Sequence, residues 1–187
     1  MSAGGARVGS EHSGHEPRQL RPLAQHYLKD LIYGANDGII TTFAVVAGVT
    51  GAELAPRVVL ILGFANLLAD GFSMGASNFL AIRSDEAVRR SSGLSMFEPF
   101  PFRHALATFA AFVLAGTIPL VSYVLTVREA AFASAVLLTL ATLFGVGAAR
   151  SLVVDTPWYR AGAEMLLVGA AAAAVAYGVG DLVSRLT

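Results

Sequence analysis

Residues 31–52 read LIYGANDGIITTFAVVAGVTGA, and residues 58–82 read VVLILGFANLLADGFSMGASNFLAI. Each stretch is long enough to cross a hydrocarbon core of about 30 Å as a helix, which takes about 20 residues. Each also carries one aspartate well inside it, Asp37 and Asp70 respectively. A carboxylate at bilayer depth costs roughly 3 kcal/mol on insertion scales, so it usually faces a partner, an ion or water. These two aspartates are therefore the first candidates for function.

The 187-residue chain as a whole is apolar, with 55% hydrophobic and 14% charged residues. The mean hydropathy of +0.63 is typical of a membrane protein. Three further stretches have spanning length, at about 104–127, 130–150 and 160–183. We therefore predict an all-α membrane protein with five transmembrane helices.

Residues 1–22 are polar and lack the apolar core of a signal peptide. We expect them to form a disordered cytoplasmic tail, leaving residues 23–187 as the transmembrane domain. Residues 18–29 could form a short interfacial helix that leads into the first span. His12 and His15 in the tail could contact a metal ion, although histidines in such a segment are more often simply solvated.

The basic residues are distributed unevenly between the two sides of the expected membrane. Ten of the 13 fall on one side: Arg7, Arg18, Arg21, Lys29, Arg83, Arg89, Arg90, Arg103, Arg150 and Arg160. The positive-inside rule then places the N-terminus in the cytoplasm and the C-terminus outside. The formal net charge is zero, which gives no reason to expect a nucleic-acid partner. Because the chain has no cysteine, disulfides and thiolate ligands are excluded.

The first span gathers oxygen-bearing side chains within two turns, at Asn36, Asp37, Thr41 and Thr42. Gly34 and Gly38 are four residues apart and offer a small face for close helix packing. Asp37 could simply form hydrogen bonds within a helix interface. With a second buried acid in the chain, we favour a role in handling ions.

The second span places polar residues on one helical face at three- and four-residue steps: Asn66, Asp70, Ser73, Met74 and Ser77, with Asn78 at the margin. A methionine in a membrane helix is usually a packing residue, but one turn from an aspartate it could be a soft ligand. A thioether with oxygen ligands suits iron(II), and oxygens alone also suit manganese(II). Gly71 and Gly75 on the same helix would permit close packing.

A depth estimate from helix rise brings four candidate ligands to one level: Asp37, Met74, Asn78 and Glu164. Glu164 could equally be an interfacial carboxylate paired with Arg160, four residues earlier. Pro119 interrupts the hydrogen bonds of the third span and could form either a hinge or a static kink.

Three segments resemble the vacuolar iron transporter family: residues 33–48 (YGANDGIITTFAVVAG), 73–80 (SMGASNFL) and 160–169 (RAGAEMLLVG). The resemblance implies a five-helix homodimer with its pathway at or near the subunit interface. It also implies export of iron(II) or a related divalent ion from the cytosol in exchange for protons. The family's first-helix aspartate maps onto Asp37, and its second-helix methionine maps onto Met74.

The chain departs from the longer family members in two places. Those members carry a helical domain rich in Glu and Met between helices two and three, whereas residues 83–103 here form a short connector, as in the nodulin-like type. The connector keeps four residues of that chemistry: Asp85, Glu86, Met96 and Glu98. The second departure is Ser77-Asn78 where the family often has Gly-Glu, and Asp70 is the candidate to compensate for the lost carboxylate.

These observations predict a divalent metal transporter that exchanges iron(II) or manganese(II) for protons, with the metal as substrate and no permanent cofactor. Asp37 would be the shared metal and proton site, Asp70 a proton relay, and Glu164 a ligand at the cytoplasmic mouth. The alternatives are a transporter of another cation and a membrane scaffold or sensor with structural acids. Enzyme motifs are lacking, and His104 is more typical of an interfacial residue than of a catalytic base. The expected location is the inner membrane of a prokaryote, or a vacuolar or other organelle membrane of a eukaryote.

Overall fold

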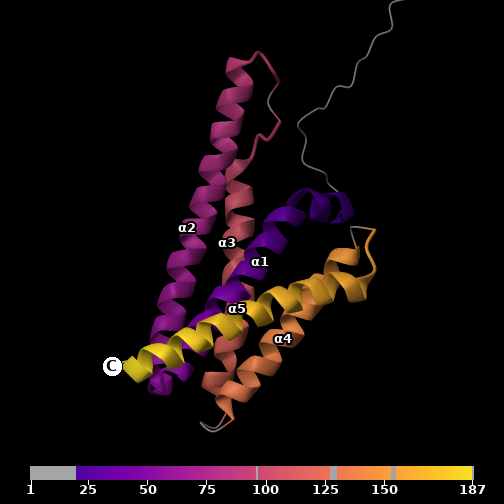
Figure 1. Ribbon diagram of the computed structural model, residues 1–187. Coiled ribbons are helices and arrows are strands. Elements are labelled where there is room, and N and C mark those ends of the chain that lie inside the picture. Colours follow the sequence, from indigo (N-terminus) through magenta and orange to yellow (C-terminus); the bar gives the residue numbers. More distant parts are fainter. Residues whose placement is uncertain (1–19, 96, 127–129, 153–154, 187) are drawn as a thin grey trace, which may run out of the picture.

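The computed structural model describes residues 20–95, 97–126, 130–152 and 155–186, with the side chains of residues 20–25 left aside. Within them the helices are α1 (Leu20–Gly51), α2 (Pro56–Ser91), α3 (Pro101–Leu125), α4 (Ala131–Ala149), a 3-10 turn (Arg150–Leu152) and α5 (Trp158–Leu186) (Figure 1). Five of these helices are long and apolar enough to cross a membrane, so the predicted fold class is confirmed. Which terminus faces the cytoplasm stays a prediction. The proposed tail lies outside the described residues up to residue 19, including His12 and His15, and residues 20–22 already belong to α1.

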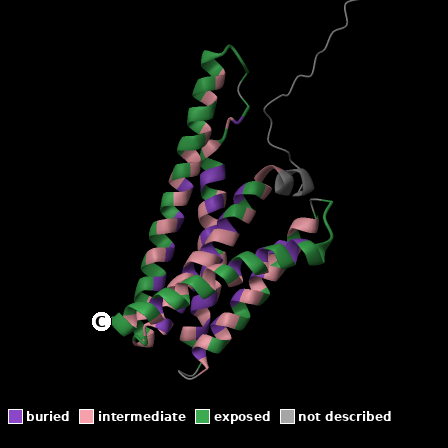
Figure 2. Cartoon of the chain, in the orientation of Figure 1, coloured by how far each residue is buried: buried purple, intermediate pink, exposed green. Residues whose placement is uncertain are grey.

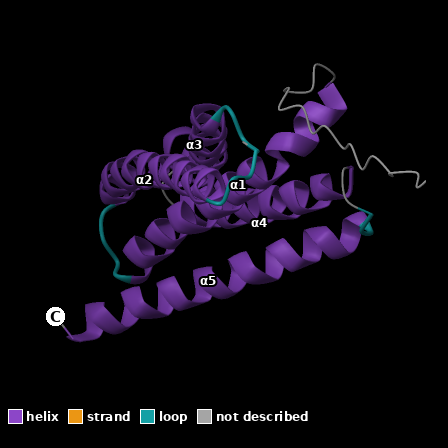
Figure 3. Ribbon diagram, turned by 90° about the horizontal axis from the view of Figure 1, so that it is seen from above, coloured by secondary structure: helices purple, strands orange, loops and turns teal. Residues whose placement is uncertain are grey.

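Helix α1 is the central element of the bundle, because it contacts each of the other four long helices. Helices α2 and α3 pack against one another on one side of α1, and α4 and α5 form a second pair. Seen from above, α4 and α5 run side by side across the view (Figure 3). The central position of α1 buries Asp30 and Thr42 and leaves Asn36, Asp37 and Thr41 half-buried.

Burial follows this arrangement, with buried positions concentrated where α1, α3 and α4 meet (Figure 2). The main apolar cluster comprises Phe43, Val46, Ala47, Val49, Val59, Leu67, Phe112, Leu120 and Ala135. Half of the most apolar window of α1 is buried within the chain, against 11% for α5. Helix α5 therefore leaves most of its surface to lipid or to another protein.

Close contact between α1 and α3 depends on two glycines of α1. A Cβ atom at Gly34 would collide with the carbonyl oxygen of Thr108, and one at Gly38 would collide with the backbone of Phe112. Because backbone atoms cannot move aside as a side chain can, these positions fix how closely the two helices approach.

Helix α2 continues nine residues past the predicted end of the second span at residue 82 and stops at Ser91. The expected connector of residues 83–103 is thus mostly helix, and α3 begins at Pro101. The segment from Arg83 to Ser91 is polar, but it contains no glycine or proline to end the helix. Gly93, with a φ of 71°, ends it in a Schellman motif, in which Leu94 N–H donates to Arg89 O at 2.9 Å.

The Gly93→Ala variant is expected to destabilise the protein by about 1 kcal/mol, because alanine pays a steric cost in the left-handed region. The matched opposite change is Glu53→Gly, since Glu53 holds a φ of 55° in the turn after α1. This change should stabilise the protein. Thermal unfolding in detergent would compare the two variants, and a midpoint raised by Gly93→Ala would contradict the expectation.

Candidate metal-handling site

A buried polar cluster joins α1, α2 and α3, with Asp30 at its centre. Asp30 is only 7% exposed. Its Oδ1 accepts a hydrogen bond from Asn78 Nδ2 at 2.7 Å, and its Oδ2 lies 2.5 Å from His104 Nδ1. A carboxylate only accepts hydrogen bonds, so His104 Nδ1 carries the proton in this contact. The contact therefore fixes the tautomer and the orientation of the His104 ring.

The amide of Asn78 links the same three helices. Its Nδ2 also donates to Thr108 Oγ1 at 2.8 Å, and the Thr108 hydroxyl donates to the carbonyl oxygen of His104 at 3.0 Å. Both amide hydrogens of Asn78 are thus used within the cluster. The amide oxygen is the atom of Asn78 that could bind a cation.

The second ring nitrogen of His104, Nε2, lies near the carboxylate of Glu98. Glu98 Oε2 lies 3.0 Å from His104 Nε2 and 3.1 Å from His26 Nε2. The His104–Glu98 contact is not aligned for a hydrogen bond, and among the described residues His104 Nε2 has no hydrogen-bond partner. The ring of Tyr27 packs on both histidine rings, with centroids 4.8 Å from His26 and 4.6 Å from His104.

Glu98 reaches this position because the connector folds back on the end of α2. Glu86 Oε1 accepts hydrogen bonds from the backbone N–H groups of Phe97, at 2.9 Å, and Glu98, at 2.7 Å. Glu98 Oε1 accepts the N–H of Phe100 at 2.9 Å, which leaves Oε2 directed at the histidines. The helical extension of α2 beyond residue 82 supplies Glu86, so it positions Glu98.

The two membrane aspartates lie further along the helices, where Asp37 and Asp70 are near enough for their charges to interact. Asp70 Oδ2 accepts a hydrogen bond from Asn66 Nδ2 at 2.7 Å. At the preceding position in sequence, the side-chain oxygen of Asn36 is buried without a hydrogen-bond partner in the described part of the chain. A buried oxygen without a partner can accept a hydrogen bond from water or bind a cation.

The polar groups of α1 and α2 lie at two levels along the helices, Asp30 with Asn78 and Asp37 with Asp70, and we call this arrangement the ladder. On α1, Asp30 and Asp37 are seven residues apart, about 10 Å of helix rise. Candidate groups on α2 follow one another at four-residue steps of about 6 Å each: Asn78, Met74, Asp70 and Asn66. Since α2 runs antiparallel to α1, Asn78 is level with Asp30, and Asp70 is level with Asp37. The sequence-based depth estimate had instead placed Asn78 level with Asp37.

The remaining predicted site residues have different surroundings. Met74 is half-buried and packs against the main apolar cluster. The Glu164 side chain is 70% exposed on α5, and its Oε2 lies 3.6 Å from Arg150 Nη1, so its ion pair is with Arg150 and not with Arg160. Pro119 is buried within α3, which runs unbroken from Pro101 to Leu125. Ligation by Met74 and Glu164 and a hinge at Pro119 stay predictions.

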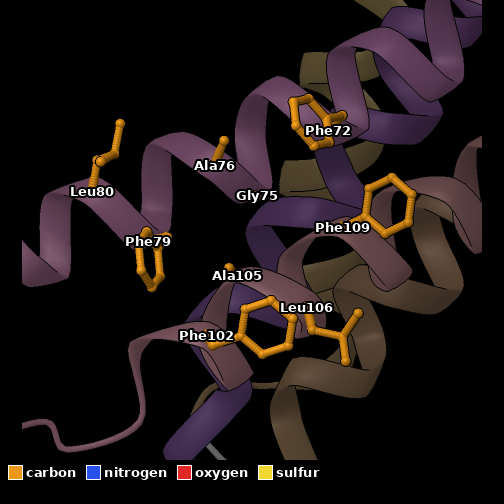
Figure 4. A pocket seen from close by; sticks show the side chains of 9 residues that line it. All are labelled: Phe72, Gly75, Ala76, Phe79, Leu80, Phe102, Ala105, Leu106 and Phe109. Carbon is orange, nitrogen blue, oxygen red and sulfur yellow. The ribbon is translucent and has the colours of Figure 1, made fainter.

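The apolar groove between α2 and α3, about 460 Å³ in volume, is separate from this ladder (Figure 4). Its lining side chains consist of carbon alone: Phe72, Ala76, Phe79, Leu80, Phe102, Ala105, Leu106 and Phe109, with Gly75 between the helices. A Cβ atom at Gly75 would lie 2.9 Å from Ala105 O, and one at Gly71 would lie 3.1 Å from Phe112 Cδ1. The helices approach closely here, and the groove lining offers no ligand for a metal ion.

The sequence profile of the VIT family matches residues 28–96 and 85–181. The chain belongs to the VIT family. With five helices of spanning length, this VIT family member is an integral membrane protein. The two matched segments overlap at residues 85–96, where α2 ends and the connector begins.

Three curated relatives show the extent of the likeness. A vacuolar iron transporter of Toxoplasma gondii is 26% identical over 239 positions, covering 92% of this chain and 79% of that protein. Vacuolar iron transporter 1 of Eucalyptus grandis is 25% identical over 248 positions, covering 97% and 99%. Vacuolar iron transporter homolog 1 of Arabidopsis thaliana is 28% identical over 169 positions, covering 84% and 83%. The first two alignments exceed the 187 residues of this chain, which is of the short VIT type.

Sequence reasoning missed the cluster around Asp30, which lies one residue before the first predicted span. One signal was present in the spacing: His26 and Asp30 are four residues apart on α1, as are His104 and Thr108 on α3. Asp30 also precedes Asp37 by seven residues, two helical turns, and so shares its face. The contact between Asp30 and His104 joins residues 74 apart in sequence and has no local signal.

Proposed function

We propose that this protein transports a divalent transition-metal ion, iron(II) or manganese(II), across its membrane in exchange for protons. The observation that carries the proposal is the pair of membrane carboxylates Asp37 on α1 and Asp70 on α2, close enough for their charges to interact. The names of the relatives as vacuolar iron transporters support the metal as substrate.

Exchange follows from the repulsion between the two carboxylates. Asp37 and Asp70 repel one another when both are charged, and either a bound proton or a metal cation relieves that repulsion. A metal ion that binds to Asp37 therefore displaces a proton, and a returning proton displaces the metal. Asp70, level with Asp37 and held by Asn66, is suited to pass the proton on.

The neighbouring side chains favour a borderline first-row ion. Met74 is one helical turn from Asp70 and offers a thioether near the two carboxylates, a combination that suits iron(II). Asn78 offers an amide oxygen at the other level, beside Asp30, and oxygen ligands also suit manganese(II). Glu164, exposed beside Arg150, would collect ions at the cytoplasmic mouth.

The family resemblance further suggests a homodimer that moves metal out of the cytosol. Helix α5 supports a second copy as the partner, because most of its apolar surface lies uncovered within one chain. Its small residues, with Gly169 and Gly180 already packed inward, would permit close contact between helices.

The experiment is uptake of iron(II), manganese(II) and cobalt(II) into proteoliposomes with an imposed proton gradient, read together with the internal pH. We expect metal flux that depends on the gradient and is accompanied by proton counterflow. Flux without proton movement would overturn the exchange mechanism. No flux of any of these ions from a stably folded protein would favour a scaffold, or a transporter of another cation.

A further inference from the structure

The structure assigns a second metal site, formed by His26, Glu98 and His104, where a first-row divalent cation binds before it enters the membrane ladder. This inference rests on the proposed transport function for the identity of the cargo, but the site itself is defined by geometry. It lies at the join of α1, the connector and α3, beside the level of Asp30 rather than that of Asp37.

The three donor atoms already converge. His26 Nε2, Glu98 Oε2 and His104 Nε2 all lie within 4.8 Å of one another, with both nitrogens 3.0–3.1 Å from the carboxylate oxygen. Two ligands on opposite sides of an ion, each at about 2.1 Å, are about 4.2 Å apart. A small movement of His26, whose side chain is 31% exposed, would complete the triangle around an ion.

His104 is prepared to be a ligand by its contact with Asp30. Because Nδ1 is the nitrogen that donates to the Asp30 carboxylate, Nε2 is the nitrogen whose lone pair is available to a metal ion in the neutral form of the ring. This Nε2 is buried, and among the described residues it has no hydrogen-bond partner. A carboxylate that holds the far nitrogen of a histidine is the usual support of a metal-bound imidazole. Asp30 is therefore a positioning residue for this site.

The donor set selects the class of ion. Two imidazole nitrogens with one carboxylate suit iron(II), cobalt(II), manganese(II) or zinc(II), whereas calcium and magnesium prefer oxygen ligands alone. Three protein ligands leave coordination positions for water, so the ion can be exchanged rather than trapped. Partial exposure of His26 leaves the site open at the surface of the chain.

The route of the ion from this site into the ladder follows from the position of Asp30, which contacts both. Asp30 touches His104 with Oδ2 and Asn78 with Oδ1, so the site and the first level of the ladder meet at one carboxylate. An ion released by Glu98 would next reach the side-chain oxygens of Asp30 and Asn78. The short connector thus supplies a metal ligand, Glu98, although it lacks the larger insertion of longer relatives.

The test is a titration with cobalt(II), read by its visible ligand-field absorption, on full-length tag-free protein in detergent. His12→Ala and His15→Ala are present throughout, which leaves His26 and His104 as the only histidines of the chain. We expect saturable cobalt bands that iron(II) and zinc(II) displace. Glu98→Gln and His26→Ala should weaken binding by at least about tenfold, and Asp30→Asn should do so by about 10- to 100-fold.

The matched control is Asp85→Asn, an exposed carboxylate of α2 that should leave the bands unchanged. Cobalt binding that survives both Glu98→Gln and His26→Ala in folded protein would overturn the inference, as would a wild type without bands. The proposed transport function and the proposed metal site can be overturned independently of one another. Bands without metal flux would leave this site standing and overturn transport, whereas flux without bands would do the reverse.

Discussion

Replacing Asp37 by asparagine is expected to reduce metal flux to the leak rate of protein-free vesicles while the protein stays folded. Asparagine keeps the shape of the side chain but cannot release a proton or neutralise a cation. It also removes the charge that interacts with Asp70, so neither step of the exchange can occur at this level. The measurement is gradient-driven uptake of iron(II) or manganese(II) into proteoliposomes, with folding checked by size-exclusion chromatography.

Asp85→Asn is the control for Asp37→Asn, because it removes a carboxylate from the exposed end of α2. This variant should transport like the wild type. Flux at the wild-type rate from Asp37→Asn would show that Asp37 is a structural acid. The pathway would then have to be sought elsewhere.

The Gly38→Ala variant is expected to lose most of its folded population, although the change adds only one methyl group. That methyl group would overlap the backbone of Phe112, so α1 and α3 would have to separate. Overpacking commonly costs about 1–3 kcal/mol, and we expect the upper end or more because no side chain can move aside. The measurement is the fraction of monodisperse protein after extraction, followed by thermal unfolding.

Gly145→Ala on α4 is the matched control, since a Cβ atom there would meet nothing within 4 Å. In a helix interior alanine is favoured over glycine by about 1 kcal/mol, so this variant should be as stable as the wild type or more so. Equal stability of the two variants would contradict the close α1–α3 contact.

The sequence predicts the five helices well because length and hydropathy are local properties of each stretch. Asp37 and Asp70 are easily noticed in the sequence, because a charge inside an apolar run stands out, and their role in transport stays a prediction. Helical spacing correctly placed Asn66 and Asp70 on one face, where they form a hydrogen bond. The helices and the shared face of Asn66 and Asp70 are predictable because length, hydropathy and helix periodicity require no knowledge of neighbouring helices.

The parts that sequence could not predict depend on tertiary contacts. Glu98 looked like one of several leftover acids of the connector, and it becomes buried only because Glu86 holds the chain that folds back. Asp30 gains its role from His104 on another helix. The partner of Glu164 is Arg150 and not its helical neighbour Arg160, because the turn after α4 approaches α5.

The length of α2 has a practical consequence for imaging. A 36-residue helix is about 54 Å long, whereas the hydrocarbon core is about 30 Å thick. Its far end stands clear of the bundle in Figure 1 and ends at the Gly93 turn. A soluble marker domain joined in helical register after Ser91 would be carried rigidly outside a detergent micelle. Such a fusion would give a protein of 19.4 kDa the bulk and asymmetry that single-particle alignment needs.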